Sequence, residues 1–148
     1  NDFAMKKIFF AVVSLLMFLL TSCEGDTKVY YASDFGIVPG TGEDMTEEML
    51  SALIGRYEAA ITCFCFMGGD AEPLEVEKIS RWIKSRWPHI RTAWYSGKES
   101  LPEGFDIKVM DYIKLGPYKA ELGGLKSPHT NQALYRIAED GTFVKCTL

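Results

Sequence analysis

A chain of 148 residues, 47% of them hydrophobic, predicts a single domain with short additional segments. The formal net charge is −4, and charges of both signs are mixed along the chain without a long run of either. This balance argues against a general nucleic-acid-binding protein, which would carry a basic face, and it predicts an ordinary solvated surface.

The first segment, MKKIFFAVVSLLMFLLTSC over residues 5–23, has the features of an export signal in their usual order. Lys6 and Lys7 precede an uncharged core, residues 8–20, which is expected to be helical and is short for a membrane span of about 20 residues. The closing LTSC resembles a bacterial lipobox, which implies cleavage before Cys23, lipidation of its sulfur and attachment to a membrane. An uncleaved membrane anchor and a buried apolar helix are the alternatives.

The next segment, residues 23–44, is rich in Gly, Asp and Thr and is expected to be a linker with one short strand within Lys28–Ala32. Its sequence from Ala32 onward, ASDFGIVPGTGED, is similar to the opening of secreted pectate-lyase-type β-helix proteins. No repeat at β-helix spacing follows, so this similarity does not define the fold.

The body of the chain begins with a predicted amphipathic helix over residues 45–59. Asp44 and Thr46 are both suitable N-caps. Apolar residues then recur at helical spacing: Met49, Leu50, Leu53, Ile54 and Tyr57. The six-residue run ITCFCF, residues 61–66, predicts a strand that is buried on both faces.

A second amphipathic helix is predicted over residues 73–86, because Pro73 suits a first helical turn and Pro88 stops the pattern. Strands are predicted at residues 90–95 and within residues 107–115. Near the end, ALYRI and TFVKC flank the turn sequence AEDG and predict a β-hairpin. The alternation of helices and strands predicts an α/β fold with a mostly parallel sheet.

Two of the four cysteines, Cys63 and Cys65, are two positions apart on a predicted strand, so their side chains leave the same face. We interpret both as small core residues rather than as metal ligands or disulfide partners. No metal ligand is predicted from the sequence, because no Cys or His cluster has zinc-site spacing.

Glycine-bearing loops follow the first two strands of the body: MGGDAEP, starting at Met67, and SGKESLPEG, starting at Ser96. Ligands of parallel α/β sheets bind at the carboxyl ends of strands, where glycines allow close approach and a helix N-terminus favours anions. The carboxylate of Asp70 at this edge is suited to accept hydrogen bonds from a ligand ammonium. A tight turn without a ligand remains the alternative for Gly68 and Gly69.

Three stretches resemble the activating protein of anaerobic ribonucleoside-triphosphate reductase, a radical S-adenosylmethionine enzyme. They are ITCFCFMGGDAEP (61–73), RTAWYSGKESLP (91–102) and DYIKLGPYKAELGGLKSPHTNQALYRI (111–137). The resemblance covers about 100 of the 148 residues. It implies an incomplete (β/α) barrel, a four-iron four-sulfur cluster, S-adenosylmethionine as cofactor and the reductase as protein partner.

In this family, the glycine-rich motif after the second strand holds the methionine end of the cofactor. The cofactor-binding residues that the resemblance implies are Gly68, Gly69, Asp70, Tyr95, Ser96 and Gly97. Among them, Asp70 is the expected acceptor for the amino group. Further residues match the family's C-terminal segment without an assigned role, and packing is the alternative for them: Lys114, Tyr118, Asn131 and Gln132.

The motif C-x-x-x-C-x-x-C, which holds the cluster in this family, is absent from the sequence. Without several thiolates there is no cluster to cleave the cofactor, so no catalytic residue is predicted and the domain is expected to be inactive. The family is cytoplasmic, whereas the signal directs export. We therefore interpret the chain as a chimera of a leader and signal (1–22), a linker (23–44) and a truncated activase-like domain (45–148). The alternative is a membrane-anchored lipoprotein with a non-catalytic α/β binding domain.

Overall fold

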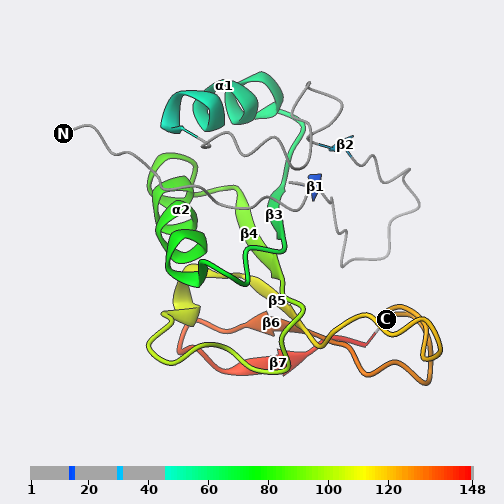
Figure 1. The fold of residues 1–148 in the computed structure, drawn as a ribbon. Coiled ribbons are helices and arrows are strands. Elements are labelled where there is room, and N and C mark those ends of the chain that lie inside the picture. The colour runs from blue at the N-terminus through cyan, green and yellow to red at the C-terminus, as the bar shows by residue number, and fades with distance from the viewer. Residues whose placement is uncertain (1–13, 16–29, 32–45, 148) are drawn as a thin grey trace.

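The structure is a computed structural model that describes residues 14–15, 30–31 and 46–147. Its body is an α/β arrangement in which two helices pack on one face of a sheet (Figure 1). The helices are α1 (Glu47–Tyr57) and α2 (Pro73–Arg86), with a short 3-10 helix, η2 (Ile107–Val109). The strands of the body are β3 (Cys63–Met67), β4 (Arg91–Tyr95), β5 (Tyr112–Leu115), β6 (Ala133–Ile137) and β7 (Phe143–Lys145).

Both predicted helices are confirmed, and local chemistry explains their ends. The side chain of Thr46 caps α1 by accepting a hydrogen bond from the backbone N–H of Met49 at 3.2 Å. Pro73 lies in the first turn of α2, and Lys84 and Arg86 lie in its last turn, where the helix dipole favours positive charge.

The sheet is mixed, so the expected mostly parallel sheet is wrong. The order of the described strands is β2-β1-β3-β4-β5-β6-β7, and among them only the β3–β4 and β4–β5 pairs are parallel. A parallel pair needs a crossover that returns the chain to the starting edge, and α2 supplies one between β3 and β4. Residues 116–132 contain no crossover helix, so β6 runs back antiparallel to β5. The predicted hairpin is confirmed as β6 and β7.

The outer edge of β3 is paired with the N-terminal part of the chain. β1 (Ser14–Leu15) lies antiparallel to β3, with Ser14 opposite Cys65, and β2 (Tyr30–Tyr31) pairs with β1. The short strand expected within 28–32 is confirmed at Tyr30–Tyr31. At Ser14–Leu15 the chain is extended, so the expected hydrophobic helix does not include these two residues; an extended segment can satisfy the free backbone groups of a strand edge.

The other expectations for the N-terminal part, including lipidation of Cys23 and the linker 23–44 apart from Tyr30–Tyr31, lie outside the described residues. Within the ranges that the structure describes, no helix is both long and apolar enough to cross a bilayer.

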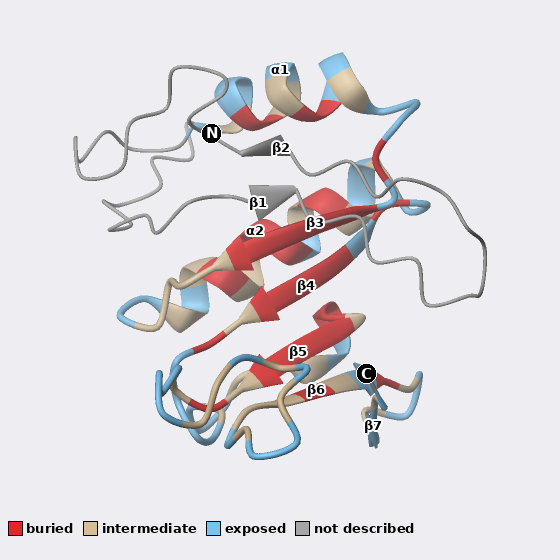
Figure 2. Cartoon of the chain, turned by 90° about the vertical axis from the view of Figure 1, so that its right-hand side faces the viewer, coloured by how far each residue is buried: buried red, intermediate tan, exposed pale blue. Residues whose placement is uncertain are grey.

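The two faces of the sheet carry separate buried clusters because side chains alternate along each strand. Helices α1 and α2 pack on the face that carries Phe64, Phe66 and Trp94. Figure 2 looks onto the opposite face, with α2 behind the buried strands β3 and β4. This opposite face carries Cys63 and Cys65, so their interpretation as core residues is confirmed. The buried members of its cluster are Cys63, Cys65, Ala93, Tyr112 and Leu134.

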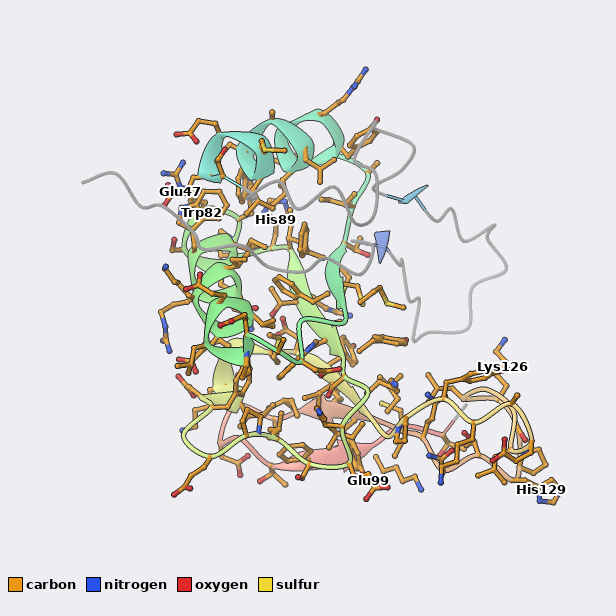
Figure 3. The ribbon with its side chains drawn as sticks, in the orientation of Figure 1. Glu47, Trp82, His89, Glu99, Lys126 and His129 are labelled. Atoms are coloured by element: carbon orange, nitrogen blue, oxygen red, sulfur yellow. The ribbon has the colours of Figure 1, made fainter. Side chains whose placement is uncertain are left out.

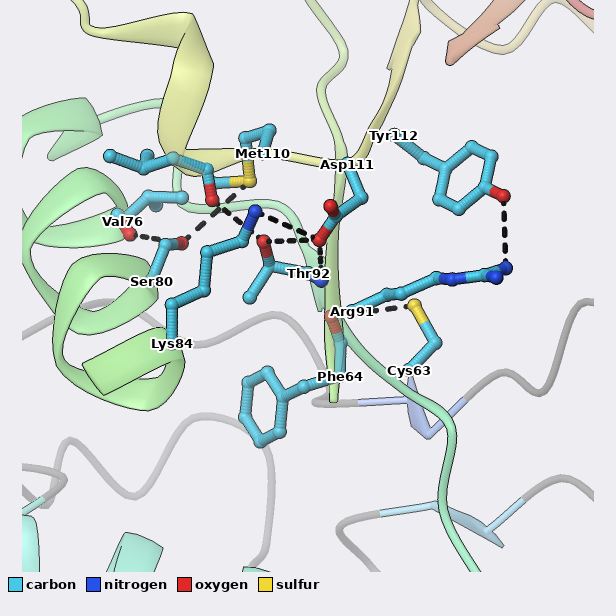
Figure 4. A network of polar contacts seen from close by, with 11 residues as sticks. Cys63, Phe64, Val76, Ser80, Lys84, Arg91, Thr92, Met110, Asp111 and Tyr112 are labelled. Atoms are coloured by element: carbon cyan, nitrogen blue, oxygen red, sulfur yellow. Dashed lines mark hydrogen bonds and ion pairs between the residues drawn. The ribbon is translucent and has the colours of Figure 1, made fainter. Parts of the chain in front are cut away.

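A polar network joins α2 to the beginnings of β4 and β5 (Figure 4). Oδ2 of Asp111 accepts a hydrogen bond from the backbone N–H of Thr92 at 2.7 Å and pairs with Nζ of Lys84 at 3.0 Å. The hydroxyl of Thr92, which is fully buried, donates to the carbonyl of Val109 at 2.7 Å. The network therefore fixes β4 against the chain that leads into β5.

Replacing this hydroxyl tests the network. The Thr92→Val variant keeps the side-chain shape but leaves the buried carbonyl of Val109 without its donor, so we expect about 1–3 kcal/mol less stability toward urea unfolding. Thr62→Val is the matched control, because Thr62 is exposed just before β3, and it should change stability by less than about 0.5 kcal/mol. Equal stability of the two variants would show that the network contributes nothing.

Candidate functional site

Strands β3, β4 and β5 are parallel, so their carboxyl ends meet at one edge of the sheet. The arrowheads of these strands point to that edge in Figure 2. The segments that follow them are residues 68–72, 96–98 and 116–118. We call this edge the carboxyl edge. It brings together the turn that contains Gly68 and Gly69, which we call the glycine turn, and the loop after β4, both of which were predicted from the sequence as ligand-binding loops.

The glycine turn has a backbone that strongly favours glycine. Gly68 and Gly69 have φ values of 99° and 85°, which L side chains rarely adopt. A Cβ atom on Gly69 would also lie 2.7 Å from Cγ2 of Val76 in α2. The indole Nε1 of Trp94 donates to the carbonyl of Gly68 at 2.6 Å and anchors the turn to β4. The glycines are thus explained by the turn itself, whether or not a ligand binds there.

The carboxylate of Asp70 joins the glycine turn to the loop after β4. Its Oδ1 accepts from the hydroxyl of Ser96 at 2.5 Å, and its Oδ2 accepts from the backbone N–H of Gly97 at 2.9 Å. Ser96 is 1% exposed, so this contact is enclosed. Three residues predicted from separate sequence stretches therefore form one hydrogen-bonded unit.

A buried cation, Lys114, lies at the same edge, and no role was predicted for this lysine. It is 6% exposed, and its Nζ donates to the carbonyl of Gly116 at 2.8 Å. Burial lowers the pKa of Lys114, while the negative charge of Asp70 acts in the opposite direction. The available signal was a lysine within the otherwise apolar strand YIKL, because lysines are rarely buried without a reason.

Tyr95 stands beside Lys114, since the two residues are register partners in the β4–β5 pair. Its ring packs with the cluster that contains Cys63 and Cys65, on the sheet face opposite the helices. Burial, followed by the neighbouring cysteines, raises the pKa of Tyr95, so the phenol stays protonated. Tyr95 thus belongs to a sheet face next to the edge, and not to the loop that holds Ser96 and Gly97.

The two ends of the segment 116–132 are joined by side-chain hydrogen bonds. The side chain of Gln132 donates to the carbonyl of Gly116 at 3.3 Å, and that of Asn131 donates to the carbonyl of Pro117 at 2.9 Å. These contacts assign a structural role to Asn131 and Gln132. The middle of the segment projects from the body, where Figure 3 labels Lys126 and His129. The side chain of Tyr118, the last residue of the edge segment 116–118, is 67% exposed.

The described cysteines do not fit an iron–sulfur cluster. Burial raises the pKa of Cys63 to about 12 and that of Cys65 well above its usual value, so both are protonated thiols in the core. Cluster iron needs several thiolates in one place. In the described ranges, no group of three or more Cys, His, Asp or Glu side chains is arranged to hold a metal ion.

Comparisons with protein-family models, with curated proteins and with solved structures found no match to this chain.

Removing the buried charge tests whether Lys114 stabilises or destabilises the fold. We expect Lys114→Met to raise the Tm by a few degrees, roughly 1 kcal/mol, because an ammonium no longer has to be desolvated and the carbonyl of Gly116 keeps its bond from Gln132. The folded-state pKa lies below the usual 10.5, so the penalty is present at neutral pH. The gain should shrink as the pH rises toward 10.5. Lys98→Met, at an exposed lysine, is the control, and a loss of Tm specific to Lys114→Met would contradict the expectation.

Alkylation tests the state of the core thiols. In native protein at pH 8, we expect iodoacetamide to label the half-exposed Cys146 and to spare Cys63 and Cys65, because both are buried and protonated. Peptide mass spectrometry reads out each site, and protein unfolded in urea should be labelled at all three. Native labelling of Cys63 as fast as that of Cys146 would contradict the buried assignment.

Proposed function

We propose that residues 46–147 form an S-adenosylmethionine-binding domain of the kind found in reductase-activating proteins. The observation that carries this proposal is the carboxyl edge, where the buried ammonium of Lys114 lies at the ends of three parallel strands together with the glycine turn and Asp70. Such an edge is where α/β sheets bind ligands. The resemblance of the stretches at 61–73, 91–102 and 111–137 to reductase activases supports the choice of ligand.

The donor set fits the methionyl end of this cofactor. Its α-carboxylate needs a cation, and Lys114 has three N–H donors, of which the carbonyl of Gly116 takes one. A bound carboxylate would stabilise the charged form of Lys114 and so offset the desolvation that lowers its pKa. The phenol of Tyr95, one strand away, would line the same end of the ligand.

In this proposal, the described sheet forms only part of the barrel that the resemblance implies. Strands β3, β4 and β5, with α2 on one face, correspond to a portion of an incomplete (β/α) barrel, and β6 and β7 close its end as a hairpin. The 148 residues contain no C-x-x-x-C-x-x-C motif, and the described cysteines do not fit a cluster. We therefore assign cofactor binding to this domain and no reductive cleavage. The anaerobic reductase is the protein partner that the resemblance implies.

Calorimetry with S-adenosylhomocysteine, a stable analogue, tests the proposal. Wild-type protein should bind it, adenosine should bind at least tenfold more weakly because it lacks the methionyl end, and Lys114→Met should lose about tenfold or more in affinity. Lys126→Met, at an exposed lysine of the projecting segment, should bind like wild type. No binding of the analogue, or full binding by Lys114→Met, would overturn the proposed function.

The cluster is tested separately by anaerobic reconstitution with iron and sulfide. We expect no stoichiometric iron to remain after desalting. A retained cluster with its thiolate-to-iron absorption would restore the catalytic interpretation.

A further inference from the structure

A series of hydrogen bonds, joined through the backbone of Lys98 and Gly116, runs along the carboxyl edge from Asp70 to Lys114. The hydroxyl of Ser96 donates to Asp70 and accepts from the backbone N–H of Lys98 at 3.0 Å. The carbonyl of Lys98 then accepts from the N–H of Gly116 at 2.7 Å, and the carbonyl of Gly116 accepts from Nζ of Lys114. Each of the three strand-end loops is therefore bonded to the next.

Asp70 is the anionic end of this path, and both of its carboxylate oxygens are already engaged by the protein. Bonds to a carboxylate are roughly twice as strong as neutral ones, and they gain further when they are enclosed, as the bond from the buried Ser96 is. A Cβ atom on Gly97 would lie only 3.3 Å from Oδ2, so the loop backbone closes tightly on the carboxylate. This geometry is that of a group that holds a loop in place.

We propose that Asp70 is a positioning residue, which holds the loop after β4 against Lys114, and that the site recognises the carboxylate of its ligand and not its α-ammonium. The ligand class rests on the proposed function: an adenosyl thioether or sulfonium whose side chain ends in a carboxylate. This differs from the role that the resemblance implies, in which Asp70 accepts the amino group. The two roles predict different affinities for a ligand that lacks the amino group.

A pair of ligands separates the two roles. S-adenosylhomocysteine and its deamino analogue, which lacks only the α-amino group, are titrated into wild type, Asp70→Asn and Ser96→Ala. We expect wild type to bind both within about threefold, and each variant to weaken both ligands by the same factor, about tenfold. The double variant should lose little more than either single one, because both act through one contact. A wild-type preference of tenfold or more for the amino form, abolished by Asp70→Asn, would overturn the proposal.

A second measurement needs no ligand. Hydrogen exchange at the amides of Gly97 and Lys98 should be slow in wild type and about tenfold faster or more in Asp70→Asn and Ser96→Ala, because their acceptors are lost or displaced. Glu99→Gln, at an exposed carboxylate of the same loop, is the control and should leave both rates unchanged.

The two measurements also separate the two proposals. Protein that binds neither ligand but shows this exchange pattern would overturn the ligand assignment and leave Asp70 as the holder of the loop. Unchanged exchange in both variants would overturn the positioning role itself.

Discussion

Parallel pairing of β3, β4 and β5 is the constraint on which the rest of this structure depends. Parallel neighbours must start at one edge and end at the other, so the chain has to cross back along a face, and α2 does this between β3 and β4. The same constraint places the segments after all three strands side by side. The contacts among Asp70, Ser96 and Gly97 are a direct consequence, although these residues lie up to 27 positions apart in sequence.

The opposite ends of the strands are held in a different way from the carboxyl edge. There, Asp111 links Thr92 to Lys84 of α2, and its charge is compensated by a nearby ammonium. At the carboxyl edge, Lys114 is buried with a carbonyl as its hydrogen-bonding partner, so it costs desolvation without a directly paired carboxylate. Under the proposed function, the carboxylate of a bound ligand would offset this cost.

Much of the fold could be predicted because the signals were local. The apolar period, Pro73 and Pro88 define α2, and Thr46 caps α1. The direction of β6 could not be predicted from its own residues, since it depends on whether residues 116–132 fold as a crossover helix. The site was predictable in part. Gly68, Gly69 and Asp70 predict a turn from local sequence. The burial of Lys114 could not be predicted in this way, because it depends on neighbours from other parts of the chain.

The sequence by itself determined the elements of the body, the two faces of β3 and the residue types available at the carboxyl edge. Hydrophobic period and backbone preference act over a few residues, and these properties can be followed along the chain. Only the tertiary structure decided that the sheet is mixed, that Ser14–Leu15 pairs with β3, and that Asp70 bonds to Ser96 and Gly97. Such contacts depend on which strand ends meet, and strand register and direction are set by the packing of the whole sheet.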